Sequence, residues 1–468
     1  MRNVVAAGLT ALALAPASNA NAQADLEART DALFERWDRA GSPGCALGVV
    51  QDGRMVYERG YGFANLDYGL PNGPEMVYYV GSVSKQFSAA SIALLAQEGR
   101  IALDDDVRKY IPELPDYSRP ITIRNLVHHT SGLRDIYTLM SLAGIRMEDV
   151  LPDDAALALI ARQKELNFLP GEDYLYSNSG YWLLGQIIER VTGESLREYA
   201  RTKIFEPLGM RDTHFHDEPW HPITNRVISY AAVPDGEPRI AYLGNFDKIG
   251  AGGLYTTLDD LRKWDSNFYE PRVGGDAFLR TIHTPGVLNN GDTLSYAFGL
   301  MLGEYRGLRT VRHSGGLMGF RAELARVPDE RFTVIVQCNQ GDIDATALAN
   351  GVIDIYLEDK LGEPAIRTAP PSQRRPPAAD WQPAPGALQE FSGEYRSEEL
   401  DVIYRIAIDD GALVLHHPLQ GATPMRPASN DVFEVAGFRL RFERSGQDVA
   451  GFRVDAGRVR NIGFARVR

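Results

Sequence analysis

The order of strand-like and helix-like segments is the feature that most constrains the fold of this chain. Residues 45–51 and 54–62 read as two strands, and Asp52-Gly53 between them is a strong hairpin signal. A mainly helical block follows, from Ser82 to about Met210. Strand signals return later, at residues 308–313, 319–327 and 332–338. This order predicts one antiparallel sheet completed from both ends of the chain, with a helical domain inserted between its two parts.

The C-terminal part of the chain differs in pattern from the rest. The 468 residues exceed the usual size of one compact core, so more than one domain is expected. Seven prolines fall within residues 364–385, and we predict a stiff, exposed linker over 364–386. Residues 387–468 then alternate in the manner of strands, with a turn signal at Ala456-Gly457. The predicted fold is α+β over residues 25–363, followed by a small all-β, barrel-like domain.

The first 24 residues have the three parts of a secretory signal peptide. Arg2 precedes an apolar run from Val4 to Ala15, and small residues follow at Ala22-Gln23-Ala24. We predict cleavage after Ala24 and hence a periplasmic or secreted protein. The alternative is a retained membrane anchor, but the apolar run is too short to span a bilayer comfortably. No later segment resembles a membrane-spanning helix, so membrane insertion is not expected.

The net charge restricts the possible partners. Removing residues 1–24 takes away one basic residue of 49, so 48 basic residues face 62 acidic ones and the net charge becomes −14. An acidic surface argues against nucleic acid and against an anionic membrane as partners. It leaves a small-molecule or peptide substrate open.

Two cysteines, Cys45 and Cys338, are too few to form a disulfide framework or a zinc site by themselves. Both lie in predicted strands, and an exported chain would oxidise them if they were neighbours. Because only a minority of cysteine pairs meet the geometric limits of a disulfide, we predict two separate buried thiols.

Ser82 and Lys85 stand three residues apart at what reads as a helix start. Residues of the following helix are apolar on most sides, which is typical of a buried helix. On such a helix Ser82 and Lys85 share a face, and the unpaired N–H groups of the helix start favour an anion near Ser82. This spacing also occurs by chance, and an ordinary helix start with a surface lysine is the alternative.

Two further stretches accompany the serine and the lysine. Tyr176 and Asn178 lie in the turn-rich segment 170–180, just before another helix, and His313 with Gly315 ends a predicted strand. In this order the three motifs resemble those of the penicillin-recognising serine hydrolases, which include class C β-lactamases, DD-peptidases, D-aminopeptidases and related esterases. Their signature is Ser-x-x-Lys, then Tyr-x-Asn, then Lys-Thr-Gly or His-x-Gly. The resemblance covers about residues 25–360 and implies a β-lactamase-like fold.

The resemblance also implies roles for these residues. Ser82 would attack an acyl carbon and carry a covalent acyl group, with Lys85 or the phenolate of Tyr176 as its base. A tyrosine has a pKa of about 10, so Tyr176 would serve near neutrality only if nearby cations lowered it. Asn178 would hold the amide or ester dipole of the substrate. The N–H groups of Ser82 and Gly316 would form the oxyanion hole.

His313 departs from the β-lactamase pattern, because it stands in place of a lysine. With an ordinary pKa of about 6.5, histidine is a poorer permanent anchor for a substrate carboxylate. We therefore predict an exported serine hydrolase that acts through an acyl-serine on D-residue peptides or amides, or on small esters. The alternatives are a β-lactamase proper and a non-catalytic protein that binds cell-wall fragments in the same pocket.

Other residues are weaker candidates for a functional role. Arg321 is expected to pair with a carboxylate rather than with substrate. His214, His216, Asp217 and His221 lack a recognised metal-ligand spacing, and His128 and His129 are expected to shape the fold around the site. The chain contains no Gly-x-Ser-x-Gly elbow, His-Glu-x-x-His motif or phosphate-binding glycine loop. We predict neither a metal nor a cofactor.

Overall fold

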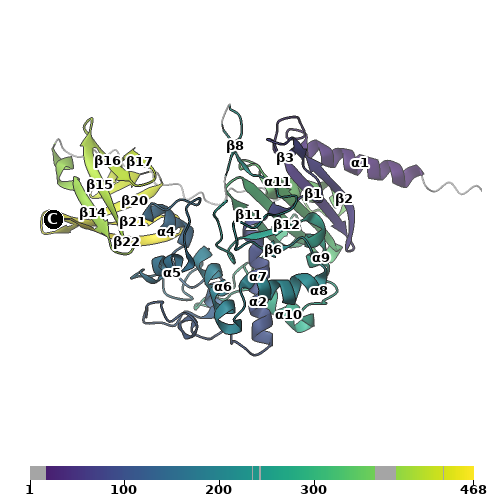
Figure 1. The fold of residues 1–468 in the computed structure, drawn as a ribbon, viewed down its shortest axis with the longest axis horizontal. Helices are drawn as coiled ribbons and strands as arrows, with labels where there is room; N and C mark the ends of the chain where they lie inside the picture. The colour runs from purple at the N-terminus through teal and green to yellow at the C-terminus, as the bar shows by residue number, and fades with distance from the viewer. Residues whose placement is uncertain (1–16, 234–235, 242–243, 364–385, 436, 468) are drawn as a thin grey trace, which may run out of the picture.

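The structure, a computed structural model, describes residues 17–233, 236–241, 244–363, 386–435 and 437–467. Figure 1 shows a larger unit of helices and sheets and a smaller all-β unit built from the C-terminal residues. The larger unit mixes helices with an antiparallel sheet, so the predicted α+β class is confirmed.

A six-stranded antiparallel sheet forms the centre of the larger unit. Its strands, in spatial order, are β10 (Met301–Tyr305), β11 (Leu308–Leu317), β12 (Phe320–Val327), β13 (Phe332–Cys338), β1 (Cys45–Gln51) and β2 (Arg54–Tyr61). Strands β1 and β13 pair along their whole length although they come from opposite ends of the unit. The predicted sheet with an inserted helical region is therefore confirmed, and the edge strand β10 is an addition to it.

The predicted hairpin joins β1 to β2. Asp52 and Gly53 both have positive φ, 52° and 76°, as the two central residues of a type I′ turn require. This turn has the twist that lets two adjacent strands pair directly, and β1 and β2 do so from Gln51↔Arg54 onward.

Helices cover both faces of the sheet. Helices α1 (Ala17–Phe34) and α11 (Ala345–Tyr356) pack on one face, and α9 (Leu258–Ser266) packs on the other. Successive side chains of a strand point to opposite faces, so Leu47 of β1 joins the core beneath α11 while Ala46 joins the core on the other side. Because both faces are covered, β1 is buried along nearly its whole length.

The inserted region is built around helix α2 (Lys85–Gln97), which packs against α6, α7 and α10. Most of its side chains are buried, which confirms the predicted buried helix. The other helices of the larger unit are α3 (Ile123–Val127), α4 (Ile136–Ala143), α5 (Asp153–Ala161), α6 (Asn178–Thr192), α7 (Leu196–Ala200), α8 (Glu206–Leu208) and α10 (Gly275–Ile282). A three-stranded sheet lies between this region and the central sheet, with β5 (Tyr78–Tyr79), β9 (Leu254–Thr256) and β6 (His214–Phe215).

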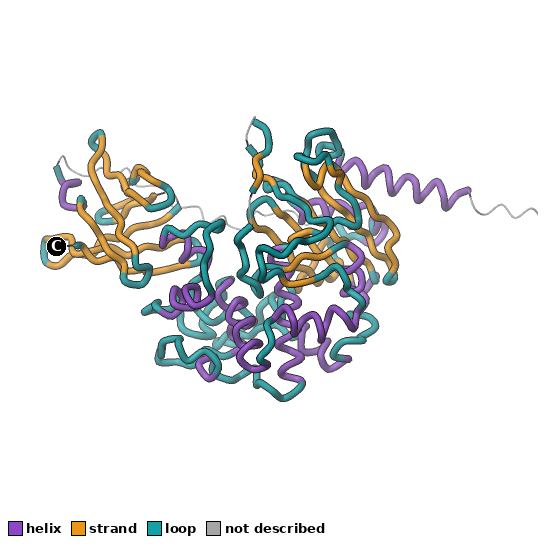
Figure 2. The backbone as a smooth tube through the Cα atoms, in the orientation of Figure 1, coloured by secondary structure: helices purple, strands orange, loops and turns teal. Residues whose placement is uncertain are grey.

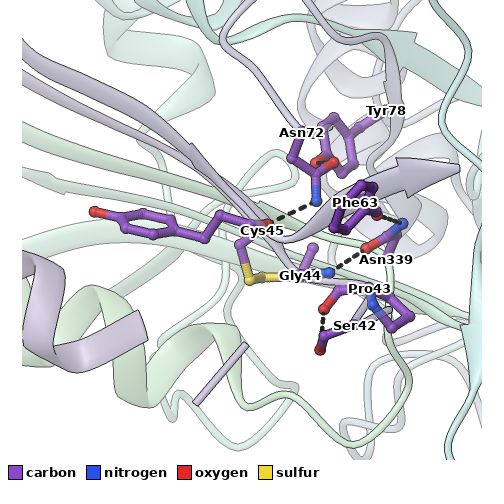
Figure 3. The surroundings of a disulfide bond; sticks show 10 residues. Ser42, Pro43, Gly44, Cys45, Phe63, Asn72, Tyr78 and Asn339 are labelled. Atoms are coloured by element: carbon purple, nitrogen blue, oxygen red, sulfur yellow. Dashed lines mark hydrogen bonds between the residues drawn. A yellow bond between two sulfur atoms is a disulfide. The ribbon is translucent and has the colours of Figure 1, made fainter. Parts of the chain in front are cut away.

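Cys45 and Cys338 form a disulfide, so the prediction of two separate thiols is wrong (Figure 3). They are directly opposite each other in the β1–β13 ladder, with Cα atoms 4.0 Å apart. The sequence places both cysteines in strands but does not give the register between strands that lie 293 residues apart. Beside the disulfide, the Asn339 side chain accepts the Gly44 N–H at 2.8 Å and donates to the Phe63 carbonyl at 3.0 Å.

The C-terminal unit is a nine-stranded antiparallel sheet that nearly closes on itself (Figure 2). Its strands in spatial order are β17 (Gly421–Pro424), β16 (Ala412–His417), β15 (Val402–Asp409), β14 (Gly393–Ser397), β22 (Val459–Arg466), β21 (Asp448–Ala456), β20 (Phe438–Ser445), β19 (Val432–Val435) and β18 (Arg426–Ser429). The two end strands, β17 and β18, are consecutive in the chain and are separated only by Met425. Buried aromatic rings fill the interior, at Phe391, Tyr395, Phe433, Phe442, Phe452 and Phe464. The predicted barrel-like domain is confirmed.

The barrel docks on the helical region beside α4 and α5 (Figure 1). Arg134 is fully buried at this junction, and its guanidinium donates to the Glu399 carboxylate at 2.6 Å and to the carbonyls of Arg460 and Asn461 at 2.9 and 3.0 Å. The Tyr404 hydroxyl donates to the Leu142 carbonyl at 2.7 Å. These buried polar contacts hold the barrel against the larger unit, at β22, at β15 and at the loop between β14 and β15.

Two sequence predictions fall largely on residues without a described structure. The predicted proline-rich linker, 364–386, lies outside the described residues except for Gly386. Helix α1 begins at Ala17 and runs through the predicted cleavage site after Ala24, so cleavage remains a prediction. Among the described residues, none of the helices combines the length and the apolar character needed to cross a bilayer.

Candidate functional site

Ser82 lies in a 3-10 turn, Gly81–Ser84, and α2 begins three residues after it at Lys85. Gly81 has a φ of 54°, and a side chain there would place Cβ 2.5 Å from the backbone nitrogen of Gly316. Glycine therefore permits both the backbone conformation and the close approach of strand β11. The turn presents the Ser82 side chain to a pocket of about 480 Å³.

The Lys85 amine is buried and lies next to the Ser82 hydroxyl. Its Nζ is 3.1 Å from Ser82 Oγ, 2.9 Å from Asn178 Oδ1 and 2.6 Å from the Ala251 carbonyl. Burial lowers the pKa of Lys85 well below its usual value, and the Arg458 guanidinium lowers it further, whereas Asp135 opposes both effects. A neutral amine gives its two N–H groups to Asn178 and Ala251 and keeps its lone pair for the Ser82 hydroxyl.

The ring of Tyr176 lies between two basic side chains. The Lys85 amine is 4.7 Å from the centre of its ring and the Arg458 guanidinium is 4.6 Å from it. Its hydroxyl is buried and has no hydrogen-bond partner among the described residues. Burial raises the pKa of Tyr176, and the neighbouring Ser82 hydroxyl and Arg458 oppose this only in part. The condition that a phenolate base would need, a pKa lowered by nearby cations, is therefore not met, and the neutral phenol is the favoured form of Tyr176.

Asn178 is the first residue of α6, and Asp135 holds its side chain in place. Asp135 Oδ2 accepts the backbone N–H of Asn178 at 2.7 Å and its side-chain Nδ2 at 2.8 Å, which turns Asn178 Oδ1 toward Lys85. Sequence reasoning missed Asp135. Its position before the apolar segment that forms α4 is a helix-cap signal, and its side chain does accept the N–H of Thr138.

Strand β11 forms the opposite wall of the pocket. Its pairing with β10 stops at Arg312, and no other described strand pairs with residues 313–317 on that edge. Ser314, Gly315 and Gly316 line the pocket there. A side chain at Gly315 would place Cβ 2.0 Å from the Val80 carbonyl and 3.0 Å from the backbone nitrogen of Ser82. The two glycines thus let β11 approach the serine turn, and the backbone N–H groups of Ser82 and Gly316 lie close together.

His313 is buried and neutral. Its Nδ1 is 2.6 Å from the Ser314 carbonyl, which only accepts, so Nδ1 carries the proton and Nε2 accepts from the Tyr296 hydroxyl at 3.1 Å. Burial and the nearby Lys85 amine lower the pKa of His313 to about 4. The sequence suggested a partly charged histidine, and the structure removes this charge near neutral pH.

The remaining pocket wall is aromatic and includes one residue of the C-terminal barrel. Arg458, in the turn between β21 and β22, lines the pocket together with Ser82. The aromatic lining residues are Tyr79, Tyr137, Tyr174, Tyr176 and Tyr296. No aspartate or glutamate is among the described residues that line it. Sequence reasoning missed Arg458, because nothing in the local sequence of a β-hairpin indicates what it docks against.

His129 supports the pocket from behind, as the sequence suggested for His128 and His129. Its ring lies 4.2 Å from the ring of Tyr176, centre to centre, and its Nδ1 accepts the N–H of Ser177 at 3.1 Å. The His128 ring packs edge-on against Phe298 and contacts the Thr284 carbonyl at 3.2 Å.

Two weaker candidates lie outside this pocket. Arg321 donates to the carbonyls of Met318 and Phe320 at 3.0 and 2.7 Å, and within the described residues it forms no ion pair, so its expected carboxylate partner is not found. His214 and His216 pack around Tyr255. The described part of the chain holds no cluster of three or more residues suited to a metal ion.

Comparison with known proteins places this arrangement in a family. The sequence model of the beta-lactamase family matches residues 29–356, which contain the serine turn, the Tyr176 segment and β11. The chain belongs to the beta-lactamase family. The resemblance seen in the three sequence motifs, over about residues 25–360, is thereby confirmed.

Curated relatives of this beta-lactamase-family chain include D-aminopeptidases. The enzyme from Gluconobacter oxydans is 30% identical over 341 residues, which cover 73% of this chain and 62% of the relative. The enzyme from Cereibacter sphaeroides is 32% identical over 351 residues, which cover 74% of this chain and 65% of the relative. The chain thus spans less than two thirds of the length of these relatives.

A solved structure matches nearly the whole chain. The octameric penicillin-binding protein homologue from Pyrococcus abyssi has a TM-score of 0.63 and 22% sequence identity, and the match covers 96% of this chain and 98% of that protein. At this identity the likeness shows the fold alone. It extends over both the beta-lactamase-family unit and the C-terminal barrel.

Proposed function

We propose that this protein is a serine hydrolase that acts through an acyl-serine on D-residue peptides or amides, or on small esters. The observation that carries the proposal is the buried Lys85 amine, 3.1 Å from Ser82 Oγ, whose pKa lies well below its usual value. A neutral amine at this distance accepts the serine proton directly. The match to D-aminopeptidases supports D-residue substrates.

Acylation starts when Ser82 Oγ attacks the substrate carbonyl and its proton passes to Lys85 Nζ. The negative charge that develops on the carbonyl oxygen lies between the N–H groups of Ser82 and Gly316. The free edge of β11 at residues 313–317 pairs with the extended backbone of the substrate and orients the scissile bond.

The leaving group needs a proton, and Tyr176 is placed to give it. Its hydroxyl is neutral and buried, and it has no other partner among the described residues. When the carbon–nitrogen bond breaks, the nitrogen takes the Tyr176 proton, and the lysine ammonium returns a proton to the phenolate. Water then attacks the acyl group with Lys85 again as base, which releases the acid and restores Ser82.

A β-lactamase proper is the weaker candidate for this pocket. The lysine that anchors a carboxylate in the Lys-Thr-Gly form of the third motif is replaced by His313, which is neutral because burial lowers its pKa to about 4. A non-catalytic binding protein would not require a lysine amine poised on the serine hydroxyl.

Export remains part of the proposal. The signal-like N-terminus motivates it, and the disulfide between Cys45 and Cys338 supports it, because disulfides persist mainly in oxidising compartments. Fractionation of the source cells, followed by mass spectrometry of the mature N-terminus, is expected to find the protein outside the cytoplasm and beginning at Gln23 to Leu26. An uncleaved cytoplasmic protein would refute export.

The proposed function is tested by labelling with a fluorophosphonate, which reacts with activated serines. The wild-type protein and Ser314→Ala are expected to be labelled, whereas Ser82→Ala is not. Ser314 is the matched control because it is the other serine that lines the pocket. Full labelling of Ser82→Ala would overturn the proposal.

A further inference from the structure

The C-terminal barrel contributes one side chain to the pocket that holds Ser82. Arg458 lies in the turn between β21 and β22 and lines the pocket with Ser82, Tyr176 and Gly316. The rest of the pocket lining comes from the beta-lactamase-family unit. The barrel is therefore part of the pocket wall rather than a separate appendage.

The backbone of this turn is held in place. The Arg458 carbonyl accepts from Asn167 Nδ2 at 2.9 Å, and the Arg460 N–H donates to Asn167 Oδ1 at 2.8 Å. The buried Arg134 guanidinium adds bonds to the carbonyls of Arg460 and Asn461. These contacts involve main-chain atoms of the turn and of the start of β22. They therefore fix the backbone from which the Arg458 side chain extends and leave its guanidinium unengaged.

The Arg458 guanidinium donates no hydrogen bond to any part of the chain that the structure describes. It stacks on Tyr176 at 4.6 Å, and Asp135 Oδ2 lies 3.9 Å away. That oxygen already accepts two hydrogen bonds from Asn178, and the other Asp135 oxygen accepts from Thr138. Among the described residues no acceptor lies within hydrogen-bond distance of the Arg458 side chain, which is 45% exposed. Its N–H groups are free to bind a ligand in the pocket.

Arg458 also supplies the positive charge of the pocket. His313 is neutral, and burial favours the uncharged form of Lys85. The tyrosines that line the pocket are neutral phenols, and no described aspartate or glutamate lines it. A free α-ammonium would thus meet a cation and find no carboxylate in the described lining. An anion would meet a guanidinium whose N–H groups donate no hydrogen bond within the described residues and whose ion pair with Asp135 is long, at 3.9 Å.

We propose that Arg458 binds a carboxylate of the substrate and thereby selects D-residue peptides or amides that carry one. This inference rests on the proposed function and sharpens it. It assigns the barrel a role in substrate specificity. It also predicts that substrates with a carboxylate are preferred over substrates with a free amino terminus. Two substrate positions supply the same chemistry: the C-terminal carboxylate of a leaving D-amino acid and an acidic side chain on the acyl residue.

The test measures how well ligands protect Ser82 of the full-length protein from a neutral fluorophosphonate. One pair of ligands is N-acetyl-D-alanyl-D-alanine and its C-terminal amide, which differ only in the carboxylate of the leaving residue. The other pair is the 4-nitroanilides of N-acetyl-D-glutamic acid, coupled through its α-carboxyl group, and of N-acetyl-D-glutamine, which differ on the acyl side. In at least one pair the acid is expected to protect at a concentration at least tenfold lower than the amide needs, which corresponds to a difference of about 1.4 kcal/mol in binding free energy.

Variants identify the residue responsible. Each variant is normalised to its own labelling rate without ligand. Arg458→Gln is expected to reduce the preference for the acid to twofold or less, and Arg458→Lys is expected to keep part of it. Arg460→Gln is the matched control, because Arg460 lies two residues after Arg458, at the start of β22, but its side chain reaches Asp173 at 3.7 Å and does not line the pocket. It is expected to behave as the wild type.

The outcomes distinguish a failure of the role of Arg458 from a failure of the proposed hydrolase function. Equal protection by acid and amide in both pairs, or an unchanged preference in Arg458→Gln, would overturn the role of Arg458 while leaving the hydrolase intact. Absence of labelling at Ser82 in the wild-type protein would instead overturn the proposed function. Thermal unfolding followed by circular dichroism shows whether each variant keeps the fold.

Discussion

Replacing Lys85 tests whether this residue acts as a neutral base or as a fixed cation. In Lys85→Met the side chain keeps a similar length, but it loses the amine that lies 3.1 Å from Ser82 Oγ. Tyr176 does not replace it, because burial raises its pKa. In Lys85→Arg a cation remains, and because a guanidinium stays protonated it does not accept the serine proton.

The expected loss follows from the contribution of general base catalysis. A positioned base contributes about 10²–10⁴-fold, or about 2.7–5.4 kcal/mol of barrier. Both Lys85→Met and Lys85→Arg are therefore expected to lower kcat/KM for a D-residue anilide by at least about a hundredfold. In the wild type, kcat/KM is expected to rise with pH through a pKa well below the usual value for lysine, since the neutral amine is the active form. This pH limb is expected to vanish in both variants.

A matched control separates catalysis from folding. Lys248 is also a buried lysine, but it pairs with Asp153 and Asp247 away from the pocket, so Lys248→Met is expected to retain activity in the fraction that folds. Steady-state kinetics on an N-acetyl-D-alanyl anilide and circular dichroism are measured for all three variants. Activity of Lys85→Arg within tenfold of wild type would refute the neutral-base reasoning.

Three further predictions concern other residues. Tyr176→Phe removes the proton donor, so kcat is expected to fall at least tenfold more for an anilide than for a nitrophenyl ester, whose leaving group needs no proton; equal losses would contradict this role. Replacing Cys45 and Cys338 together by serine opens a loop of 293 residues, and urea unfolding is expected to show that the free energy of unfolding falls by several kcal/mol, about 6 by the chain-entropy account; unchanged stability would contradict it. His313 has a folded pKa of about 4, against about 6.5 when unfolded, so the unfolded state binds more protons between these values and stability falls as the pH drops from about 6.5 to about 4. Urea unfolding at a series of pH values is expected to show that the free energy of unfolding falls by about 3 kcal/mol less in His313→Gln than in the wild type between about pH 6.5 and about pH 4. The same pH dependence in both proteins would refute the lowered pKa of His313.

The sequence predicted the fold where local patterns decide it. The Asp52-Gly53 turn fixes a hairpin because both residues tolerate positive φ, and the structure has both values. Strand alternation located the central sheet and the C-terminal barrel. The edge strand β10 was not predicted, because its exposed residues lack a strong apolar pattern.

Features that depend on contacts distant in the sequence were predicted poorly. The disulfide requires the register of β1 against β13, which neither strand encodes alone. Asp135 holds the Asn178 side chain, and Arg458 stacks on the Tyr176 ring. No spacing in the sequence indicates either contact.

The charge states of the site residues also required the three-dimensional structure. The motifs named Lys85, Tyr176 and His313, but only burial shows that all three favour their neutral forms. This burial is the reason that Lys85, rather than Tyr176, is the proposed base. It also leaves Arg458 as the cation that lines the pocket.

The most direct test of the central claim is to trap the covalent intermediate. The full-length protein is mixed with a nitrophenyl ester of N-acetyl-D-alanine and quenched in acid during turnover, and its intact mass and peptide map are measured. We predict an added mass equal to the N-acetyl-D-alanyl group, on the peptide that contains Ser82, and its absence in Ser82→Ala. Turnover of the ester without this adduct, or an adduct at another residue that persists in Ser82→Ala, would contradict the account.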